Sequence, residues 1–258
     1  MCNRVPVPDS STTRQGEVAK AAPWSLRSTP TFALGVAATA GAIVGTIGMR
    51  SDRPRTARAN SILRTWARAW VRPAGVQFEV AGLQHLEPGQ LYVVVSNHLS
   101  NLDPMVHLAA LPVPLRFLAM RELFDVPLLG AALRRIGMIE VDRQDPDGSG
   151  IARGAARALK QGVNVLVYPE GETSHDGSLN RFRLGAFTIA IDHGIPVLPV
   201  MTHGTREIWA PGSNAIRKGV VRLSIQPPIL THELSRSDAI ALRDSAYAAI
   251  AAASGKPL

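Results

Sequence analysis

An imidazole and a carboxylate, His98 and Asp103, stand together in a short polar stretch of the sequence. A carboxylate on one nitrogen of an imidazole fixes its tautomer and stabilises the protonated ring. The other ring nitrogen is then available as a general base. The pair could therefore take a proton from an alcohol or from water.

The spacing of this pair restricts how the two side chains can meet. On a continuous helix, five residues turn through roughly 500°, so His98 and Asp103 would point about 140° apart. They can meet only if His98 leaves a strand and the loop turns back onto the start of a helix. Two simpler interpretations stay open: Asp103 could be an ordinary N-cap before Pro104, and His98 a loop histidine bonded to backbone.

The elements around the pair predict an α/β fold. An apolar, β-branched run predicts a strand over 91–96, and the Asp-Pro pair predicts a helix over about 105–111. Strands alternate with helices along the rest of the chain, which favours a mostly parallel central sheet flanked by helices. The other predicted strands are 77–80, 116–120, 138–141, 163–168, 197–200 and 220–225, and the other predicted helices are 126–136, 150–161, 185–193 and 237–253.

Polar residues follow two more of these strands, where open α/β sheets carry their sites. Arg143 follows strand 138–141, and a guanidinium suits bidentate binding of phosphate. Glu170 and Gly171 follow strand 163–168 in a Pro-Glu-Gly turn, where glycine allows a ligand to approach the backbone. Arg143 could instead be a surface arginine paired with a neighbouring aspartate, and the Pro-Glu-Gly segment could be a plain turn.

The N-terminal part of the chain divides into three predicted segments. Residues 1–30 are rich in Ser, Thr and Pro and predict a disordered leader. Residues 31–49 carry no charge and are long enough as a helix to cross a membrane, so a transmembrane helix is predicted there. The alternatives are a buried helix of the main domain or a linker. Residues 56–72 predict a basic amphipathic helix that lies on a membrane or packs on the main domain. The catalytic domain is then expected over 75–258.

Charge and cysteine content exclude several classes of site. The net charge is +8, and seven arginines lie between residues 50 and 72, which suits an anionic partner. The single cysteine, Cys2, rules out an intramolecular disulfide, a cysteine-cluster metal site and a cysteine nucleophile in the core. The sequence has no nucleic-acid-binding motif, so no nucleic-acid partner is expected. No metal ion is expected either, because the proposed chemistry of the imidazole and carboxylate does not require one.

The order and spacing of four motifs resemble the glycerolipid acyltransferase family typified by 1-acyl-sn-glycerol-3-phosphate acyltransferase. These are Asn-His-x4-Asp (97–103), Gly-x4-Asp-Arg (137–143), Pro-Glu-Gly (169–171) and Ile-Pro-Val-Leu-Pro-Val (195–200). The resemblance implies that His98 and Asp103 are catalytic. It implies substrate binding by Asn97, Arg143, Glu170, Gly171, Thr173 and Arg183.

This sequence departs from the family pattern at two positions. The family usually continues Pro-Glu-Gly with Thr-Arg-Ser, whereas this chain has Glu172-Thr173-Ser174. Threonine therefore replaces an arginine that would face a phosphate, and Arg181 or Arg183 could supply the charge instead. Tyr168 replaces a usual phenylalanine.

The resemblance implies transfer of a fatty acyl group from acyl-CoA or acyl carrier protein to the hydroxyl of a lysophospholipid. The expected acceptor is 1-acyl-sn-glycerol-3-phosphate, giving phosphatidate, and no cofactor is needed beyond the acyl donor. The protein is expected at the membrane, with its catalytic domain on the cytoplasmic side. The alternatives are another lysolipid or hydroxylated acceptor, a hydrolase that uses the same pair on water, and a non-catalytic lipid-binding protein.

Overall fold

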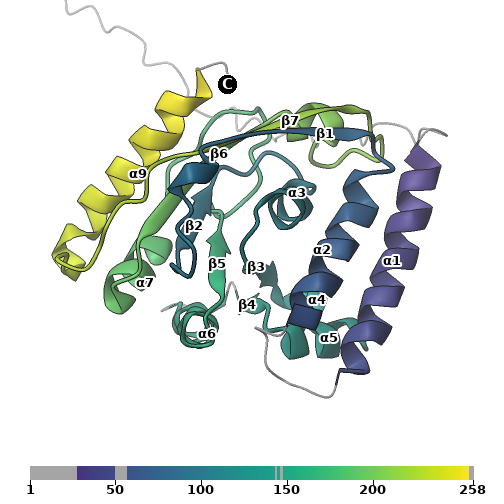
Figure 1. Cartoon of the computed structure of the whole chain (residues 1–258), viewed down its shortest axis with the longest axis horizontal. Helices are drawn as coiled ribbons and strands as arrows, with labels where there is room; N and C mark the ends of the chain where they lie inside the picture. Colours follow the sequence, from purple (N-terminus) through teal and green to yellow (C-terminus); the bar gives the residue numbers. More distant parts are fainter. Residues whose placement is uncertain (1–27, 50–56, 143, 146–147, 256–258) are drawn as a thin grey trace, which may run out of the picture.

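The computed structural model describes residues 28–49, 57–142, 144–145 and 148–255. Most of the predicted leader and Arg143 therefore lie outside the described residues. The described chain forms one mostly parallel sheet with helices on both faces, which confirms the predicted fold class (Figure 1).

Seven strands form the sheet in the order β1-β7-β6-β2-β5-β3-β4. Neighbouring strands run parallel, except that β6 and β7 are antiparallel. Each of the seven predicted strands is present, with ends shifted by up to three residues. Their bounds are β1 Val76–Ala81, β2 Val93–Ser96, β3 Leu115–Met120, β4 Ile139–Val141, β5 Asn164–Val167, β6 Val197–His203 and β7 Gly219–Ile225.

The central strands are buried on both faces, which explains their nearly continuous apolar sequences. Side chains alternate along each strand, so Val94, Leu166 and Leu198 join one core cluster. Their neighbours Val93 and Val165 join the other cluster. The first cluster also contains residues of α2 (Ala57–Val71), α3 (Asp103–Ala110) and α5 (Leu129–Ile136), and the second contains residues of α6 (Ser149–Lys160), α7 (Gly185–His193) and α9 (Ala239–Ser254).

The predicted helix 126–136 is shorter and is preceded by a separate turn of helix. α4 covers Arg121–Phe124, and α5 begins only at Leu129. Proline at 127 has no N–H to continue a helix, and Leu128 has a positive φ of 64°. A further short helix, α8 (Thr205–Ile208), follows β6 and was not predicted.

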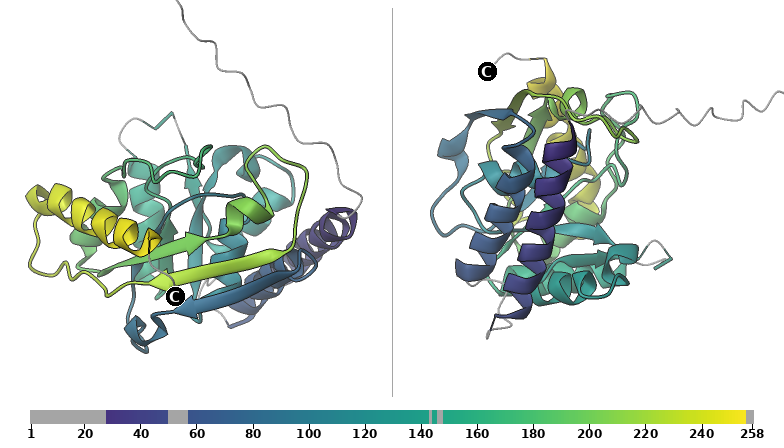
Figure 2. Two further views of the ribbon diagram at one scale, coloured as in Figure 1. Left: turned by 90° about the horizontal axis from the view of Figure 1, so that it is seen from above. Right: turned by 90° about the vertical axis from the view of Figure 1, so that its right-hand side faces the viewer.

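The N-terminal helix α1 (Thr29–Ile47) begins within the predicted leader, because Pro30 suits the first turn of a helix. It lies beside α2 on one flank of the molecule (Figure 2). Phe32 of α1 packs edge-on against Trp70 of α2 at 6.1 Å, and Trp70 stacks on Trp209 at 5.8 Å. By length and composition, α1 is the one described helix that could cross a membrane, with a mean hydropathy of 1.6.

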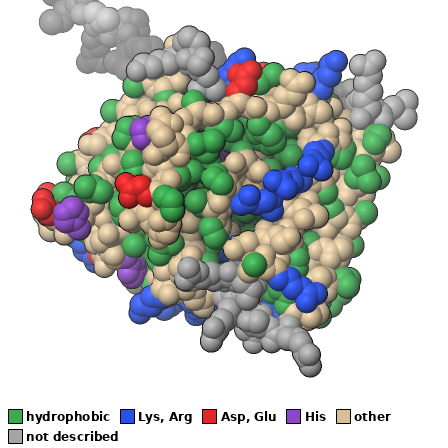
Figure 3. All heavy atoms as spheres, in the orientation of Figure 1, with side chains coloured by type: hydrophobic (Ala, Val, Ile, Leu, Met, Phe, Trp, Pro, Cys, Tyr) green, Lys and Arg blue, Asp and Glu red, His purple; other side chains and the backbone are tan. Residues whose placement is uncertain are grey.

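Basic side chains lie on the same flank as the α1–α2 pair. Figure 3 shows a band of Lys and Arg side chains across the part of that face where α2 lies. Arg58, Arg68 and Arg72 are exposed in or next to α2, and Arg64 is half-buried. In α2 the apolar side chains face the core and the arginines face outward, as expected for an amphipathic helix.

The strand order brings three loops to one edge of the sheet. β2 lies between β5 and β6 and is parallel to both. The loops that follow these three strands therefore emerge side by side. The residues after β2 carry His98, those after β5 carry Glu170, and those after β6 lead into α8.

Candidate active site

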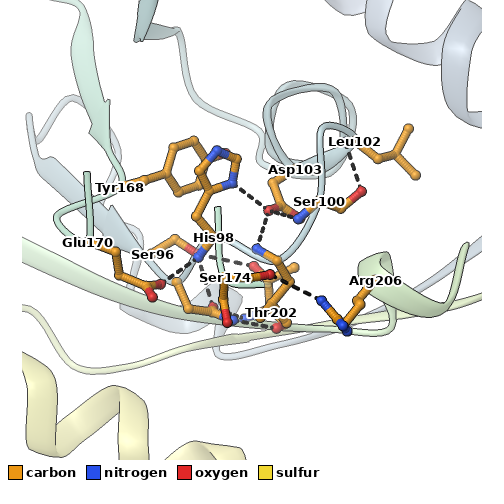
Figure 4. Close-up of polar contacts among 12 residues, drawn as sticks. Ser96, His98, Ser100, Leu102, Asp103, Tyr168, Glu170, Ser174, Thr202 and Arg206 are labelled. Carbon is orange, nitrogen blue, oxygen red and sulfur yellow. Dashed lines mark hydrogen bonds and ion pairs between the residues drawn. The ribbon is translucent and has the colours of Figure 1, made fainter. Parts of the chain in front are cut away.

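His98 and Asp103 meet at this edge of the sheet. His98 Nδ1 lies 2.8 Å from Asp103 Oδ2 (Figure 4). The loop from 97 to 102 leaves the strand and turns back onto the first turn of α3, which is the geometry that the spacing required.

Asp103 is not an N-cap. Leu102 occupies the cap position, and Asp103 is the first residue of α3. Its Oδ2 accepts hydrogen bonds from the backbone N–H groups of Leu99 (2.7 Å) and Ser100 (2.8 Å) in the preceding loop. The carboxylate therefore holds the loop and the imidazole together, and the simpler interpretation of this residue is wrong.

The imidazole lies at the surface, although its partner is buried. The side chain of His98 is 18% exposed, and that of Asp103 is 0% exposed. Nδ1 faces the carboxylate, and Nε2 has no hydrogen-bond partner among the described residues. Because a carboxylate oxygen only accepts, Nδ1 carries a proton, and a neutral His98 presents Nε2 as a base.

Glu170 links the loops after β2 and β5. Its Oε1 accepts from the backbone N–H of His98 at 2.8 Å, and its Oε2 accepts from that of Asn180 at 2.9 Å. Burial raises the pKa of this carboxyl above its ordinary value, against the opposing effect of these hydrogen bonds. Both oxygens accept a backbone hydrogen bond and the residue is 4% exposed, so the role of Glu170 in substrate binding stays a prediction.

Asn97, for which the resemblance implies substrate binding, makes two hydrogen bonds to the neighbouring strand. Its Nδ2 donates to Thr202 O at 2.9 Å, and its Oδ1 accepts from Thr202 N at 2.8 Å. The residue is 1% exposed. Asn97 therefore joins β2 to β6, and its amide is not open to a substrate.

Gly171 and Arg183 lie in contact at the exposed side of the site. Gly171 has a φ of +83°, and a Cβ there would lie 2.6 Å from Arg183 Cζ. The absence of a side chain thus lets the guanidinium lie against the loop, and the backbone N–H of Arg183 donates to Pro169 O at 2.8 Å. Thr173 is half-buried in the same loop.

Four residues near the pair were not assigned a site role from the sequence: His107, Tyr168, Thr202 and Arg206. His107 lies one helical turn after Asp103, a spacing that could have revealed it. Thr202 lies beyond the predicted end of strand 197–200, because β6 continues to His203. Arg206 follows β6 and donates to Ser174 O at 3.1 Å, so the rule for strand ends could have found it (Figure 4).

The site contains an imidazole paired with a buried carboxylate and exposed guanidinium groups. Among the described residues there is no group of three or more His, Cys, Asp or Glu side chains that could hold a metal ion. An imidazole backed by a buried carboxylate can activate a hydroxyl group or water. The arrangement alone leaves the acceptor open.

Comparisons with known proteins identify the family. A family model described as acyltransferase matches residues 77–203. The human 1-acyl-sn-glycerol-3-phosphate acyltransferase alpha is 34% identical over 172 residues, which are 66% of this chain and 61% of that protein. This chain thus spans about six tenths of the human relative's length.

A bacterial relative matches over a larger share of its length. The 1-acyl-sn-glycerol-3-phosphate acyltransferase of Pseudomonas aeruginosa is 31% identical over 180 residues, which are 67% of this chain and 69% of that protein. The crystal structure of a 1-acyl-sn-glycerophosphate acyltransferase from Thermotoga maritima has the same fold, with a TM-score of 0.73, 21% identity and coverage of 90% of this chain and 97% of that one. The chain therefore belongs to the glycerolipid acyltransferase family that includes the 1-acyl-sn-glycerol-3-phosphate acyltransferases.

Proposed function

We propose that this protein transfers a fatty acyl group from a thioester to the free hydroxyl of 1-acyl-sn-glycerol-3-phosphate, giving phosphatidate. The observation that carries the proposal is the 2.8 Å contact between His98 Nδ1 and the buried Asp103 carboxylate, while Nε2 has no partner in the described part of the chain. Family membership and the names of the relatives support the choice of acceptor.

In the proposed reaction, His98 Nε2 takes the proton of the acceptor hydroxyl as its oxygen attacks the thioester carbonyl. Asp103 keeps Nδ1 protonated and offsets the charge that develops on the ring. The new C–O ester bond forms, the C–S bond breaks, and the thiolate receives the proton from the imidazolium. A general base of this kind contributes ~10²–10⁴-fold to the rate.

Arg183 is the proposed partner of the acceptor's phosphate. It lies exposed against Gly171, next to the Glu170 carboxylate that anchors the His98 backbone. A planar guanidinium can bind two phosphate oxygens at once. Thr173, which stands where the family usually has arginine, contributes a hydroxyl in place of a charge. Arg143 is proposed as a second cation for the phosphate, as the resemblance implies. It lies outside the described residues.

The proposed donor is acyl-CoA or acyl carrier protein, and the proposed location is the membrane. α1 carries four large, exposed apolar side chains, Leu34, Val36, Val44 and Ile47, that suit contact with lipid. The arginines of and around α2 follow α1 in the chain, and basic segments favour the cytoplasmic side. The catalytic domain over 75–258 would then face the cytoplasm.

The test supplies purified full-length protein with labelled palmitoyl-CoA or palmitoyl-carrier protein and a panel of acceptors. The panel contains lysophosphatidate, lysophosphatidylcholine and monoacylglycerol, and mass spectrometry identifies the product. We expect phosphatidate to form only with lysophosphatidate, and thioester consumption to depend on that acceptor. Thioester consumption without an acceptor would indicate a hydrolase, and lipid binding without turnover would indicate a binding protein; either result would overturn the proposal.

A further inference from the structure

We propose that the half-buried Tyr168 and the buried His107 form a pair that positions the ring of His98, with Tyr168 as the wall and His107 as its anchor. This inference rests on the function proposed above, because it concerns the orientation of the general base. Neither residue contacts the reacting atoms in this proposal, so both are positioning residues.

The first observation is a face-to-face contact. The rings of His98 and Tyr168 are stacked, with centroids 4.2 Å apart and an angle of 16° between planes (Figure 4). The hydrogen bond to Asp103 fixes His98 only at Nδ1, which leaves rotation about that contact unrestrained. The flat face of Tyr168 blocks such a rotation on one side, so the direction of Nε2 depends on both neighbours.

The second observation is that the Tyr168 ring is itself held at its far end. Its hydroxyl oxygen lies 3.2 Å from His107 Nδ1, and the two rings meet edge-on at 5.8 Å. His107 is 0% exposed and lies on α3, one turn after Asp103. The helix that supplies the carboxylate thus also supplies the anchor of the wall.

The hydrogen bonds of His107 assign its tautomer. Nδ1 lies 2.8 Å from the backbone carbonyl oxygen of Asp103, which can only accept, so Nδ1 carries the proton. Burial lowers the pKa of His107, which keeps the ring neutral. Nε2 is therefore an acceptor, and it faces Thr202 Oγ1 at 3.3 Å.

Thr202 continues this chain of hydrogen bonds toward β2. Its hydroxyl donates to His107 Nε2 and lies 3.1 Å from Ser96 Oγ, which itself donates to Asn97 Oδ1. The Tyr168 hydroxyl then accepts a share of the Nδ1–H of His107. Burial raises the pKa of Tyr168 well above its ordinary value, and the Asp103 charge adds to the effect, so the phenol stays neutral. His107 is thus held at both ring nitrogens, with Nδ1–H on the side of Tyr168.

The test separates the ring of Tyr168 from its hydroxyl. Tyr168→Leu removes the wall, and we expect kcat to fall about 100-fold with little change in KM, since a small misplacement of a reacting group has such a cost. Tyr168→Phe keeps the wall and loses only its anchor, and we expect a fall of roughly 3- to 10-fold.

Matched controls come from Tyr247, whose hydroxyl also makes one hydrogen bond, donated to the carbonyl oxygen of Leu179. Tyr247 packs against Phe182 on the α9 side of the fold. Tyr247→Leu and Tyr247→Phe should leave kcat unchanged. If the Tyr168 variants lost activity only through a general loss of stability, the Tyr247 variants should lose activity as well.

A double-mutant cycle tests the anchor without the leucine variant, in case that variant does not fold. In a protein that already carries His107→Gln, the further change Tyr168→Phe should cost almost nothing, because its partner is gone. An equal loss from Tyr168→Phe in both backgrounds would overturn the role of His107.

Nuclear magnetic resonance gives a readout that does not depend on turnover. The experiment uses full-length protein with ¹³C-labelled histidine in detergent micelles. The His98 ring protons should show an upfield chemical shift, because they lie over the face of the Tyr168 ring. That shift should persist in Tyr168→Phe and vanish in Tyr168→Leu. An unchanged His98 signal in Tyr168→Leu, or wild-type kcat in that variant, would overturn the positioning proposal. Absence of acyl transfer in the wild-type protein would overturn only the proposed function.

Discussion

A single oxygen of Asp103 organises the centre of the site. Oδ2 accepts hydrogen bonds from the His98 ring and from the backbone N–H groups of Leu99 and Ser100. Three donors on one buried carboxylate oxygen fix both the loop and the imidazole. Hydrogen bonds to a charged acceptor are among the stronger ones in proteins, so this loop is set before any substrate binds.

The sequence predicted this pair, but not the roles of its neighbours. The residue types and spacing of His98 and Asp103 left one geometry in which they could meet, and the fold has that geometry. The family resemblance implies that Asn97 and Glu170 bind substrate. Both also bind backbone groups of other strands and loops, and such partners become visible only when the strand order is known.

Arg183 should affect the binding of the acceptor more than catalysis. Arg183→Ala removes the guanidinium that lies against Gly171. We expect KM for lysophosphatidate to rise about tenfold, because one charge-assisted hydrogen bond to the acceptor is lost. KM for the acyl donor should stay the same. Steady-state kinetics with Arg181→Ala as a control checks this, since Arg181 is an exposed neighbour; equal effects of the two variants would contradict the assignment.

His107 should make the stability of the protein depend on pH. Burial lowers the pKa of its imidazole, so below about pH 6.5 the unfolded chain binds a proton that the folded chain does not. The free energy of unfolding should therefore fall as the pH falls through this range. Urea titrations at pH 7 and pH 5 should show a smaller loss in His107→Gln than in the wild type. The exposed His232 is the control, and His232→Gln should behave as the wild type does.

At the scale of elements, the sheet order decides which loops can cooperate. β2 lies between β5 and β6, although β3 follows β2 in the sequence. Alternating strands and helices predicted a parallel sheet, and each predicted strand is present. The order of those strands depends on how the helices pack on both faces, which no local pattern encodes. The extension of β6 to His203 likewise reflects a tertiary contact, its antiparallel pairing with β7, whereas the break at Pro127 has a local cause.

Asn97 links two of these strands, and its loss should therefore destabilise the fold. Asn97→Ala leaves the N–H and C=O of Thr202 buried without their partner, at a cost of about 1–3 kcal/mol in the free energy of unfolding. Urea denaturation measures this cost. Asn101→Ala, at an exposed position in the same loop, should change stability by less than about 0.5 kcal/mol. A stable Asn97→Ala protein with a raised KM would restore the predicted role in substrate binding.

At the scale of the whole molecule, α1 and α2 are attached to the domain by a cluster of aromatic rings. Phe32 and Trp70 meet Trp209, which follows α8. Five residues of α2 are buried where the two helices pack on the core. They are Ala59, Leu63, Ala67, Trp70 and Val71. The proposed lipid-binding flank is therefore held in a fixed position relative to the edge that carries His98.

The exposed face of α1 should determine binding to lipid. Val36 is 62% exposed and Val44 is 71% exposed, so replacing both with glutamate changes no buried contact. We expect the double variant to bind vesicles of phosphatidylglycerol and phosphatidylethanolamine more weakly in a flotation assay and to keep its thermal stability. Ile240→Glu on α9, at 54% exposure, should float as the wild type does. Equal flotation of all three proteins would exclude α1 as the lipid-binding surface.

The most direct test of the account compares acyl transfer to lysophosphatidate by the wild type and by His98→Gln. The glutamine variant removes the base, and circular dichroism can show whether the fold is kept. The account predicts a folded variant whose kcat is lower by ~10²–10⁴-fold, with the acceptor bound as before. A folded His98→Gln protein that forms phosphatidate at the wild-type rate would contradict it.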